Sequence, residues 1–430
     1  MGGNIEQDNS GFLWKNEAVR LMRNCRYSDA FKLIKPHLYS GDDDASALIL
    51  TILRHSDNVF QLIEEVDYIK ERALAGDSIM QFAWARYNDA VSPEAESCSI
   101  AEKYYNAALR AGIADARMYL AFMYRDGDLG FVDRSRYFQE RDKAVVEGSH
   151  TAVQQTVRDI VYGNSGCQAE PEKALEMLKK YIHSESPGIY LDPEYYALAG
   201  DAAYALGNVD DASSWYRRAM NEGCLRACFF LALAAACDVD GRISDTEQFF
   251  EIMEKGQELR CPAAFLAVQM AVDEDDFENY GTELQDQVTS GLELDLETAY
   301  TLGDSIGAYY LGCHYYEGNF GFGKNDETAW MWFSRGAVRR DPFCYKMLAV
   351  MLRDENCSKK MSRDFLNECE LRALRLGCED MLDNVVDAYK NGFLTEYAAE
   401  IEQYYLPLAS NQDEEQYDEP DDDGRFDAWA

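Results

Sequence analysis

Five histidines and twelve cysteines are the residues in this chain best suited to metal binding or nucleophilic chemistry. No HExxH or CxxC spacing joins any of them, so the spacings typical of zinc sites do not occur. His314 directly follows Cys313, but adjacent residues on a helix diverge by about 100°, so the two side chains would not converge as a catalytic pair. We expect packing or surface roles for the five histidines, which are His37, His55, His150, His183 and His314.

The acidic loop ACDVDGRISDTE, residues 236–247, has the spacing of a calcium-binding loop. The residues that match such a loop are Asp238, Asp240, Gly241, Ile243 and Glu247. However, Ala236 occupies the first ligand position, where a carboxylate normally anchors the ion. Ser244 and Glu247 could instead form a capping box for a following helix, and we favour this interpretation over a calcium site.

Motifs for phosphate binding and for a serine nucleophile are incomplete or missing. The glycine-rich stretch GNFGFGKND, residues 318–326, superficially suggests a phosphate loop, but Lys324 lacks the Ser or Thr neighbour that such a loop needs. No GxSxG motif occurs. We therefore expect no catalytic residues, no metal, no cofactor and no enzymatic activity.

The helices that must position these residues are predicted by a sequence pattern that repeats along the chain. Two segments, residues 112–138 and 303–333, carry the same residue types at the same offsets from a leading glycine. The matched residues are Gly112, Ala116, Leu120, Ala121, Tyr124 and Gly127 in one segment, and Gly303, Gly307, Leu311, Gly312, Tyr315 and Gly318 in the other. An aromatic pair closes each unit, Tyr137 with Phe138 and Trp332 with Phe333.

The leading position, which we call the anchor, recurs along the chain. The other anchors are Gly148, Gly223, Arg340 and Gly377 and, more loosely, Gly76 and a residue near Leu259. Small residues one turn apart let helices approach closely, a Gly can end a helix in the left-handed conformation, and the loop Asp residues, Asp133 and Asp326, can cap the next helix. These features predict successive antiparallel helix pairs.

This pattern resembles the Sel-one-like repeat (SLR) family, a longer-looped relative of the tetratricopeptide repeat. Residues 200–220 resemble a plain tetratricopeptide unit, and residues 16–38 predict a helical pair. The resemblance implies an all-α fold, a right-handed α/α superhelical solenoid of antiparallel helix pairs, which the family uses to hold partner proteins. The register stays open over residues 149–200 and 260–302.

Composition and charge restrict the partners. Hydrophobic residues make up 47% of the chain, but no apolar run approaches the roughly 18 residues that span a membrane. The net charge of −37 repels nucleic acids and anionic lipids and attracts basic partners. The N-terminus has no signal-peptide pattern and most cysteines stand singly in apolar stretches, so we expect a cytoplasmic protein with reduced, buried cysteines.

We expect three regions: an N-terminal helical region (residues 1–69), the repeat solenoid (70–405) and an acidic disordered tail (406–430). Within that tail, residues 411–430 hold nine acidic side chains and one Arg.

The resemblance also implies where a partner would bind. In tetratricopeptide units the first helix of each pair faces the concave groove, and aromatic and Arg side chains are the usual interface anchors. Transferred to this chain, the partner-binding residues are Met118, Phe122, Arg125, Phe229, Tyr309, Tyr316, Arg353 and Lys390. The alternative is that these side chains pack between neighbouring helices.

The leading hypothesis is a non-enzymatic scaffold or adaptor that binds a protein or peptide through the concave face. An alternative is an acidic inhibitor or immunity-type protein that binds a basic enzyme or a nucleic-acid-binding protein. A third, an enzyme on a helical scaffold, has no motif in its favour.

Overall fold

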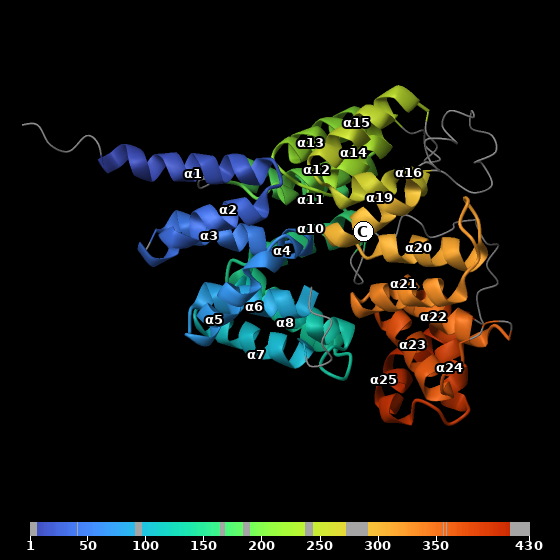
Figure 1. The fold of residues 1–430 in the computed structure, drawn as a ribbon. Helices are drawn as coiled ribbons and strands as arrows, with labels where there is room; N and C mark the ends of the chain where they lie inside the picture. Colours follow the sequence, from blue (N-terminus) through green and yellow to red (C-terminus); the bar gives the residue numbers. More distant parts are fainter. Residues whose placement is uncertain are drawn as a thin grey trace, which may run out of the picture. The chain divides into compact units, whose positions relative to one another are not determined.

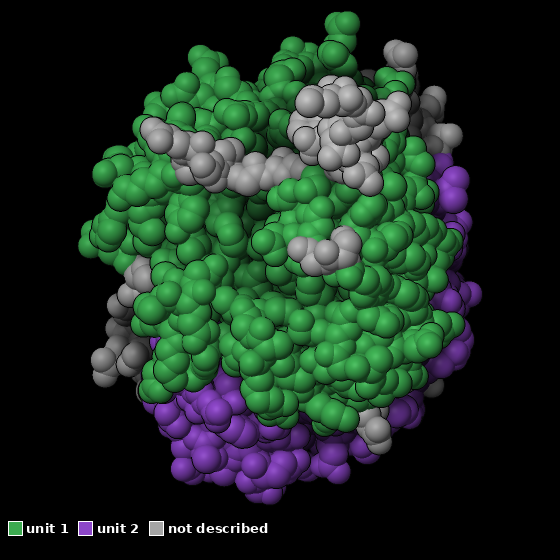
Figure 2. Space-filling model, turned by 90° about the vertical axis from the view of Figure 1, so that its left-hand side faces the viewer, with its two compact units in different colours: residues 1–120, 139–276, 430 green, residues 121–138, 277–429 purple. Residues whose placement is uncertain are grey.

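The computed structural model describes residues 7–40, 42–90, 97–163, 168–183, 190–236, 244–271, 291–355, 357 and 359–412. Within these ranges the regular elements are helices and there is no strand, so the prediction of an all-α fold is confirmed (Figure 1). No helix of this part of the chain is both long and apolar enough to cross a membrane. The chain divides into two compact units, coloured separately in Figure 2: residues 1–120, 139–276 and 430, and residues 121–138 and 277–429.

The first unit contains the helices of the N-terminal half. They are α1 (Gln7–Arg23), α2 (Tyr27–Ile34), α3 (Asp43–Leu53), α4 (Ser56–Phe60), α5 (Val66–Leu74), α6 (Ser78–Ala90), α7 (Ser97–Arg110), α10 (His150–Tyr162), α11 (Pro171–Ile182), α12 (Glu194–Ala205), α13 (Val209–Asn221), α14 (Ala227–Ala236), α15 (Thr246–Glu258) and α16 (Pro262–Ala271). Two further helices, α8 (Asp115–Asp126) and α9 (Arg134–Val146), contribute residues to both units.

The second unit contains the helices of the C-terminal part. They are α19 (Leu292–Leu302), α20 (Ile306–Glu317), α21 (Asp326–Val338), α22 (Pro342–Arg353), α23 (Arg363–Arg375), α24 (Leu382–Lys390), α25 (Ala398–Glu400) and α26 (Leu406–Gln412). Helix α26 covers the first residues of the segment expected to be a tail, and residues 413–430 lie outside the described residues.

Within each unit, helices pack mainly against their neighbours in the chain. Helix α12 packs against α11 and α13, and α20 packs against α19 and α21. Loops of eight residues or more join the two helices of some pairs, as between α20 and α21 and between α22 and α23, and the paired helices run antiparallel (Figure 1). This is the helix-pair arrangement that the sequence predicts.

The anchors are left-handed turns between one helix pair and the next. The six anchor glycines have φ between 84° and 124°, and these residues are Gly76, Gly112, Gly148, Gly223, Gly303 and Gly377. Arg340 has φ 63° and Arg260, next to Leu259, has φ 57°, although a side chain disfavours this conformation by about 1 kcal/mol. All the anchors have the same left-handed backbone conformation, so the predicted anchor positions are confirmed.

The small residues of the repeat allow close approach, as predicted. A Cβ atom at Gly307 would lie 2.5 Å from the carbonyl oxygen of Leu296 in the preceding helix. At Gly312 it would lie 2.3 Å from the ring of Phe333, the aromatic residue that closes the unit. A larger side chain would have to displace the backbone of α19 at Gly307 or the Phe333 ring at Gly312.

Helix capping agrees with the sequence at one predicted loop and differs at two. Asp133 caps α9, because its Oδ1 accepts a hydrogen bond from the backbone N of Arg136 at 2.8 Å. The predicted caps Asp326 and Ser244 are wrong by one residue: Asn325 caps α21 and Asp245 caps α15. In each pair both residue types are good caps, and the path of the loop decides between them.

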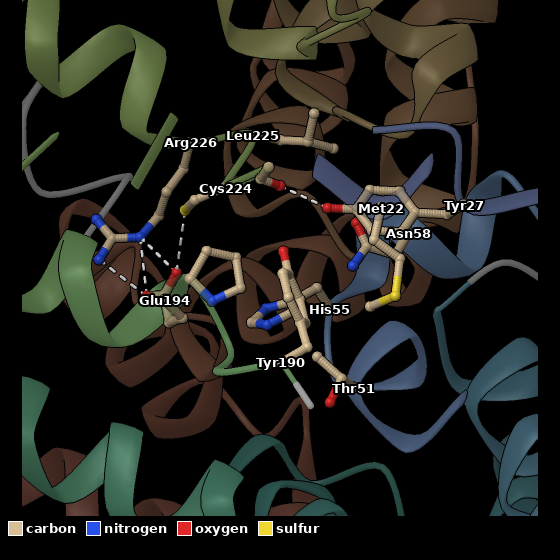
Figure 3. A pocket seen from close by; sticks show the side chains of 12 residues that line it. Met22, Tyr27, Thr51, His55, Asn58, Tyr190, Glu194, Cys224, Leu225 and Arg226 are labelled. Atoms are coloured by element: carbon tan, nitrogen blue, oxygen red, sulfur yellow. Dashed lines mark hydrogen bonds and ion pairs between the residues drawn. The ribbon is translucent and has the colours of Figure 1, made fainter. Parts of the chain in front are cut away.

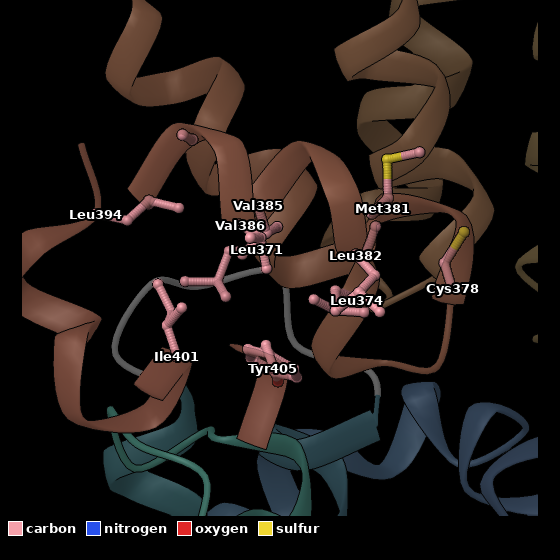
Figure 4. Close-up of a cluster of buried hydrophobic side chains, with 12 residues drawn as sticks. Leu371, Leu374, Cys378, Met381, Leu382, Val385, Val386, Leu394, Ile401 and Tyr405 are labelled. Atoms are coloured by element: carbon pink, nitrogen blue, oxygen red, sulfur yellow. The ribbon is translucent and has the colours of Figure 1, made fainter. Parts of the chain in front are cut away.

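Buried side chains form the cores of both units. In the second unit a cluster joins α23 and α24 to the last described helices, and Ile401 and Tyr405 close it (Figure 4). Leu406 and Ala409 of α26 pack against this cluster. Among the described residues, eight cysteines are buried, as expected: Cys25, Cys224, Cys228, Cys261, Cys344, Cys357, Cys369 and Cys378.

Candidate functional site

Charged residues at helix ends meet inside the first unit. Arg54 follows the last residue of α3, His55 precedes α4, Asp115 begins α8, and Glu194 begins α12. We call this set the buried ion network, and its members are Arg54, His55, Asp115, Arg158, Asp192, Glu194, Asp201 and Arg226. Its four carboxylate residues are at most 5% exposed.

Arg54 links two of the carboxylates. Its Nε donates to Asp115 Oδ2 at 2.8 Å, and its Nη1 lies 3.6 Å from Asp192 Oδ2. The other oxygen of Asp115 accepts from the Ser149 hydroxyl at 2.7 Å and from the backbone N of Thr151 at 3.0 Å. Burial raises the pKa of Asp115, but Arg54 and these hydrogen bonds outweigh burial and the net pKa is lowered.

Asp192 pairs with a histidine. His55 Nε2 lies 3.1 Å from Asp192 Oδ1, and the Gln154 side chain donates to Oδ2 at 3.0 Å. Burial lowers the pKa of His55, but the adjacent carboxylate raises it more, so the net pKa lies above its usual value. The same pairing holds the pKa of Asp192 well below its usual range, although burial acts in the opposite direction. The pair therefore favours an imidazolium beside a carboxylate.

Two arginines surround Glu194. Arg226 Nε donates to Glu194 Oε1 at 2.9 Å, and Arg158 donates to the same oxygen at 2.9 Å. Arg226 also donates to Asp201 Oδ2 at 2.8 Å, and the Tyr216 hydroxyl donates to Asp201 Oδ1 at 2.8 Å. With His55 protonated, the network holds four cations and four carboxylates, so it is electrically balanced.

A pocket opens beside the network (Figure 3). It encloses about 450 Å³ of empty space, including the solvent at its open side. Residues from α1 to α4, from the segment before α12 and from the turn before α14 line it, among them Met22, Tyr27, His55, Asn58, Tyr190 and Cys224. The pocket thus combines apolar walls with part of the ion network.

The pocket places a thiol and a histidine on one surface, which raises the question of nucleophilic chemistry. The Cys224 Sγ donates to Glu194 Oε2 at 3.6 Å. Burial raises the pKa of Cys224 well above its usual value, and the Glu194 charge raises it further. Since the reactive form of cysteine is the thiolate, this thiol is unsuited to act as a nucleophile. In the described part of the chain, no group of three or more His, Cys, Asp or Glu side chains is placed to hold a metal ion.

The sequence gives no local signal for this site. His55 was expected to have a packing or surface role, and its partner Asp192 lies 137 residues away in the chain. No local motif marks the pair, because each residue is an ordinary helix-end residue when viewed alone. The calcium-like motif cannot be compared, since residues 237–243 lie outside the described residues.

The partner-binding residues predicted from sequence fall at three repeat positions. Six residues after an anchor, Met118 and Phe229 are buried, and Tyr309 is half-buried near the rings of Phe333 and Phe343. These three side chains pack between helices, which was the alternative interpretation. Ten residues after an anchor lies Phe122, half-buried with the Arg125 guanidinium 4.7 Å from its ring centre.

The remaining predicted residues are more accessible and share one repeat position. They lie thirteen residues after their anchors, at the C-terminal ends of first helices, and we call them the helix-end set: Arg125, Tyr316, Arg353 and Lys390. Tyr316 is half-buried and the other three are more exposed.

The helix pairs, the left-handed anchors and the close approaches define an all-helical repeat protein built from successive antiparallel helix pairs. No protein-family model and no curated protein matches the chain. A Sel1 repeat protein from Oxalobacter formigenes has a similar solved structure, 17% identical, covering 75% of this chain and 89% of that one, with a TM-score of 0.36. Another is a protective antigen of uropathogenic Escherichia coli strains that displays an SLR fold, 18% identical, covering 76% and 75% of the two chains, with a TM-score of 0.32. The assignment of the repeat rests on the geometry of this chain and not on these two similarities.

Proposed function

We propose that the protein is a non-enzymatic scaffold or adaptor that binds a partner protein through the helix-end set. The observation that carries this proposal is the recurrence of accessible Arg, Tyr and Lys side chains at one repeat position. Arg and Tyr are among the residues that contribute most to protein interfaces. A helix holds the backbone of each of them, so the backbone loses little conformational entropy when a partner binds.

Two members of the set are neighbours in the second unit. The Tyr316 hydroxyl donates to Asp354 Oδ2 at 2.8 Å, and Asp354 directly follows Arg353. Arg353 in turn donates through Nε to Glu370 Oε1 at 2.7 Å. These bonds hold the Tyr316 hydroxyl at the end of α22 and the Arg353 guanidinium against α23, and the Arg353 side chain is still 42% exposed. Such a pair could contact both apolar and acidic groups of a partner.

The test is photo-crosslinking from the full-length protein in its native cells. A photoreactive phenylalanine analogue replaces Tyr316 in one variant and Met331 in a control variant. Met331 is 39% exposed on the second helix α21 of the same unit. The proposal expects the Tyr316 variant to give a discrete crosslinked partner that the Met331 variant does not give. Equal labelling from both positions, or labelling from Met331 alone, would contradict it.

The net charge of −37 favours a second candidate, an acidic inhibitor of a basic enzyme or nucleic-acid-binding protein. The two candidates differ in how binding responds to salt, because exposed charges are screened and desolvated side chains are not.

A further inference from the structure

One buried amide in the pocket of the first unit lacks a hydrogen-bond partner among the described residues. Asn58 is 5% exposed and lines the pocket, where Figure 3 shows it near Met22 and Tyr27. Its backbone groups are used: its N donates to the His55 carbonyl and its carbonyl accepts from the N of Gln61, both at 3.2 Å. Its side-chain carboxamide makes no hydrogen bond with any residue that the structure describes. The polar atoms of this carboxamide are not fully buried, so water or a ligand in the pocket can bond to them.

The hydroxyl groups that line the pocket are occupied. The hydroxyls of Tyr27 and Tyr190 donate to the carbonyls of Gly223 and Glu222. The Thr51 hydroxyl donates to the Ala47 carbonyl at 3.0 Å. Asn58 is therefore the lining residue whose donor and acceptor are both available to a ligand.

The chemistry of the pocket indicates the kind of ligand. The neighbouring ion network is electrically balanced, so neither a cation nor an anion would gain a counter-charge there. A carboxamide presents one donor and one acceptor in a plane, which complements the C=O and N–H of a peptide group. Met22, Pro193 and Leu225 add an apolar wall that could contact an uncharged side chain.

We infer that this pocket binds an extended peptide segment of a partner protein. One peptide group of the segment pairs with the Asn58 carboxamide, and a neighbouring uncharged side chain lies against Met22, Pro193 and Leu225. The inference rests on the proposed function in that the partner is a protein, but it uses a different surface from the helix-end set.

The probe is N-acetyl-leucine N-methylamide, which carries two peptide groups and one apolar side chain without a charge. It is titrated into the full-length protein labelled with ¹³C at the methionine methyl groups. The Met22 methyl lines the pocket, whereas Met80 is fully buried in α6 of the same unit and serves as an internal reference. We expect the Met22 resonance to shift saturably and the Met80 resonance to stay unchanged.

Two variants carry the same substitution inside and outside the pocket. Asn58→Leu should weaken binding of the probe at least about tenfold, because the hydrogen bonds to the peptide group are lost. Asn106→Leu should leave binding unchanged, since Asn106 lies in α7 and donates to the Glu102 carbonyl at 3.0 Å. An unshifted Met80 resonance in both variants shows that the fold is kept.

The inference is overturned if Met22 does not respond up to the solubility limit of the probe, which would mean that the pocket holds only water. It is also overturned if Asn58→Leu binds the probe as tightly as the unmodified protein. Neither result tests binding through the helix-end set, so crosslinking from Tyr316 would still support the proposed function. Conversely, a Met22 response without crosslinking from Tyr316 would leave the pocket as the binding surface and reject the helix-end set.

Discussion

Asp192 and Glu194 stand on either side of Pro193 at the start of α12, and cations from other helices neutralise both carboxylates. A buried ion pair contributes little against a well-packed apolar alternative, but removing one partner leaves a buried charge unpaired. Each charge in the network therefore needs its partner, and the network fixes α3, α4 and α12 relative to one another within the first unit.

Asp192→Asn tests this dependency. The substitution leaves His55 and Arg54 without a shared counter-charge, so we expect the free energy of unfolding at pH 7 to fall by about 3 kcal/mol. Asp142→Asn is the matched control, because Asp142 pairs with Arg141 at 3.1 Å but its side chain is 71% exposed. Urea unfolding followed by circular dichroism measures both. A loss no larger for Asp192→Asn than for the control would contradict the account.

His55 should make stability depend on pH. Its pKa is raised in the folded protein, so its protonation stabilises the fold. That stabilisation is complete below the unfolded pKa of about 6.5 and is lost as the pH rises through the folded pKa. We expect the stability difference between the unmodified protein and His55→Gln to shrink as the pH rises from about 6 towards 9. A difference that grows over this range would show that the ring is neutral in the fold.

At the scale of helices and turns, the anchors Gly223 and Gly112 differ in their surroundings. A Cβ atom at Gly223 would lie 2.4 Å from the carbonyl oxygen of Met22, where the chain returns to the end of α1. Gly112 has nearly the same φ, 95° against 96°, but a Cβ atom there would have nothing within 4 Å. A comparison of the two residues therefore distinguishes the cost of the left-handed backbone conformation from the cost of the close approach.

Gly112→Ala should cost about 1 kcal/mol of stability, the strain of a left-handed alanine. Gly223→Ala should cost that amount and on the order of 2 kcal/mol more, because the backbone at Met22 must shift. Thermal unfolding of the two variants gives the comparison. Equal destabilisation would mean that α1 does not approach the turn as closely as the structure has it.

The helices and turns could be predicted from the sequence, but the contacts between helices could not. The anchors and small residues could be predicted because their offsets recur and each offset has a local physical cause, as Arg340 shows by keeping the left-handed turn without a glycine. The position six residues after an anchor was predicted to bind a partner, yet it is the position that packs between helices. Which side of a helix meets the neighbouring pair depends on interhelical geometry that a single sequence does not contain. The same limit hid the contact between His55 and Asp192.

At the scale of the whole molecule, the net charge of −37 is the dominant property. The buried ion network is balanced, so the excess charge comes from other residues. Such a field speeds the approach of basic partners and opposes nucleic acids. Salt separates the contribution of this field from that of a desolvated contact surface, because exposed charges contribute little once salt screens them.

The most direct test of the central claim is the salt dependence of partner binding. Isothermal titration calorimetry with the crosslinked partner compares the dissociation constants of the unmodified protein, Tyr316→Ala and Met331→Ala in 0.1 M and 1 M NaCl. Over this range the screening length falls from about 10 Å to about 3 Å. We predict that the unmodified protein loses less than about tenfold in affinity, that Tyr316→Ala binds roughly five- to thirtyfold more weakly at both salt concentrations, and that Met331→Ala binds normally. Binding that collapses at 1 M NaCl while Tyr316→Ala matches the unmodified protein at 0.1 M would contradict the claim and favour the acidic inhibitor.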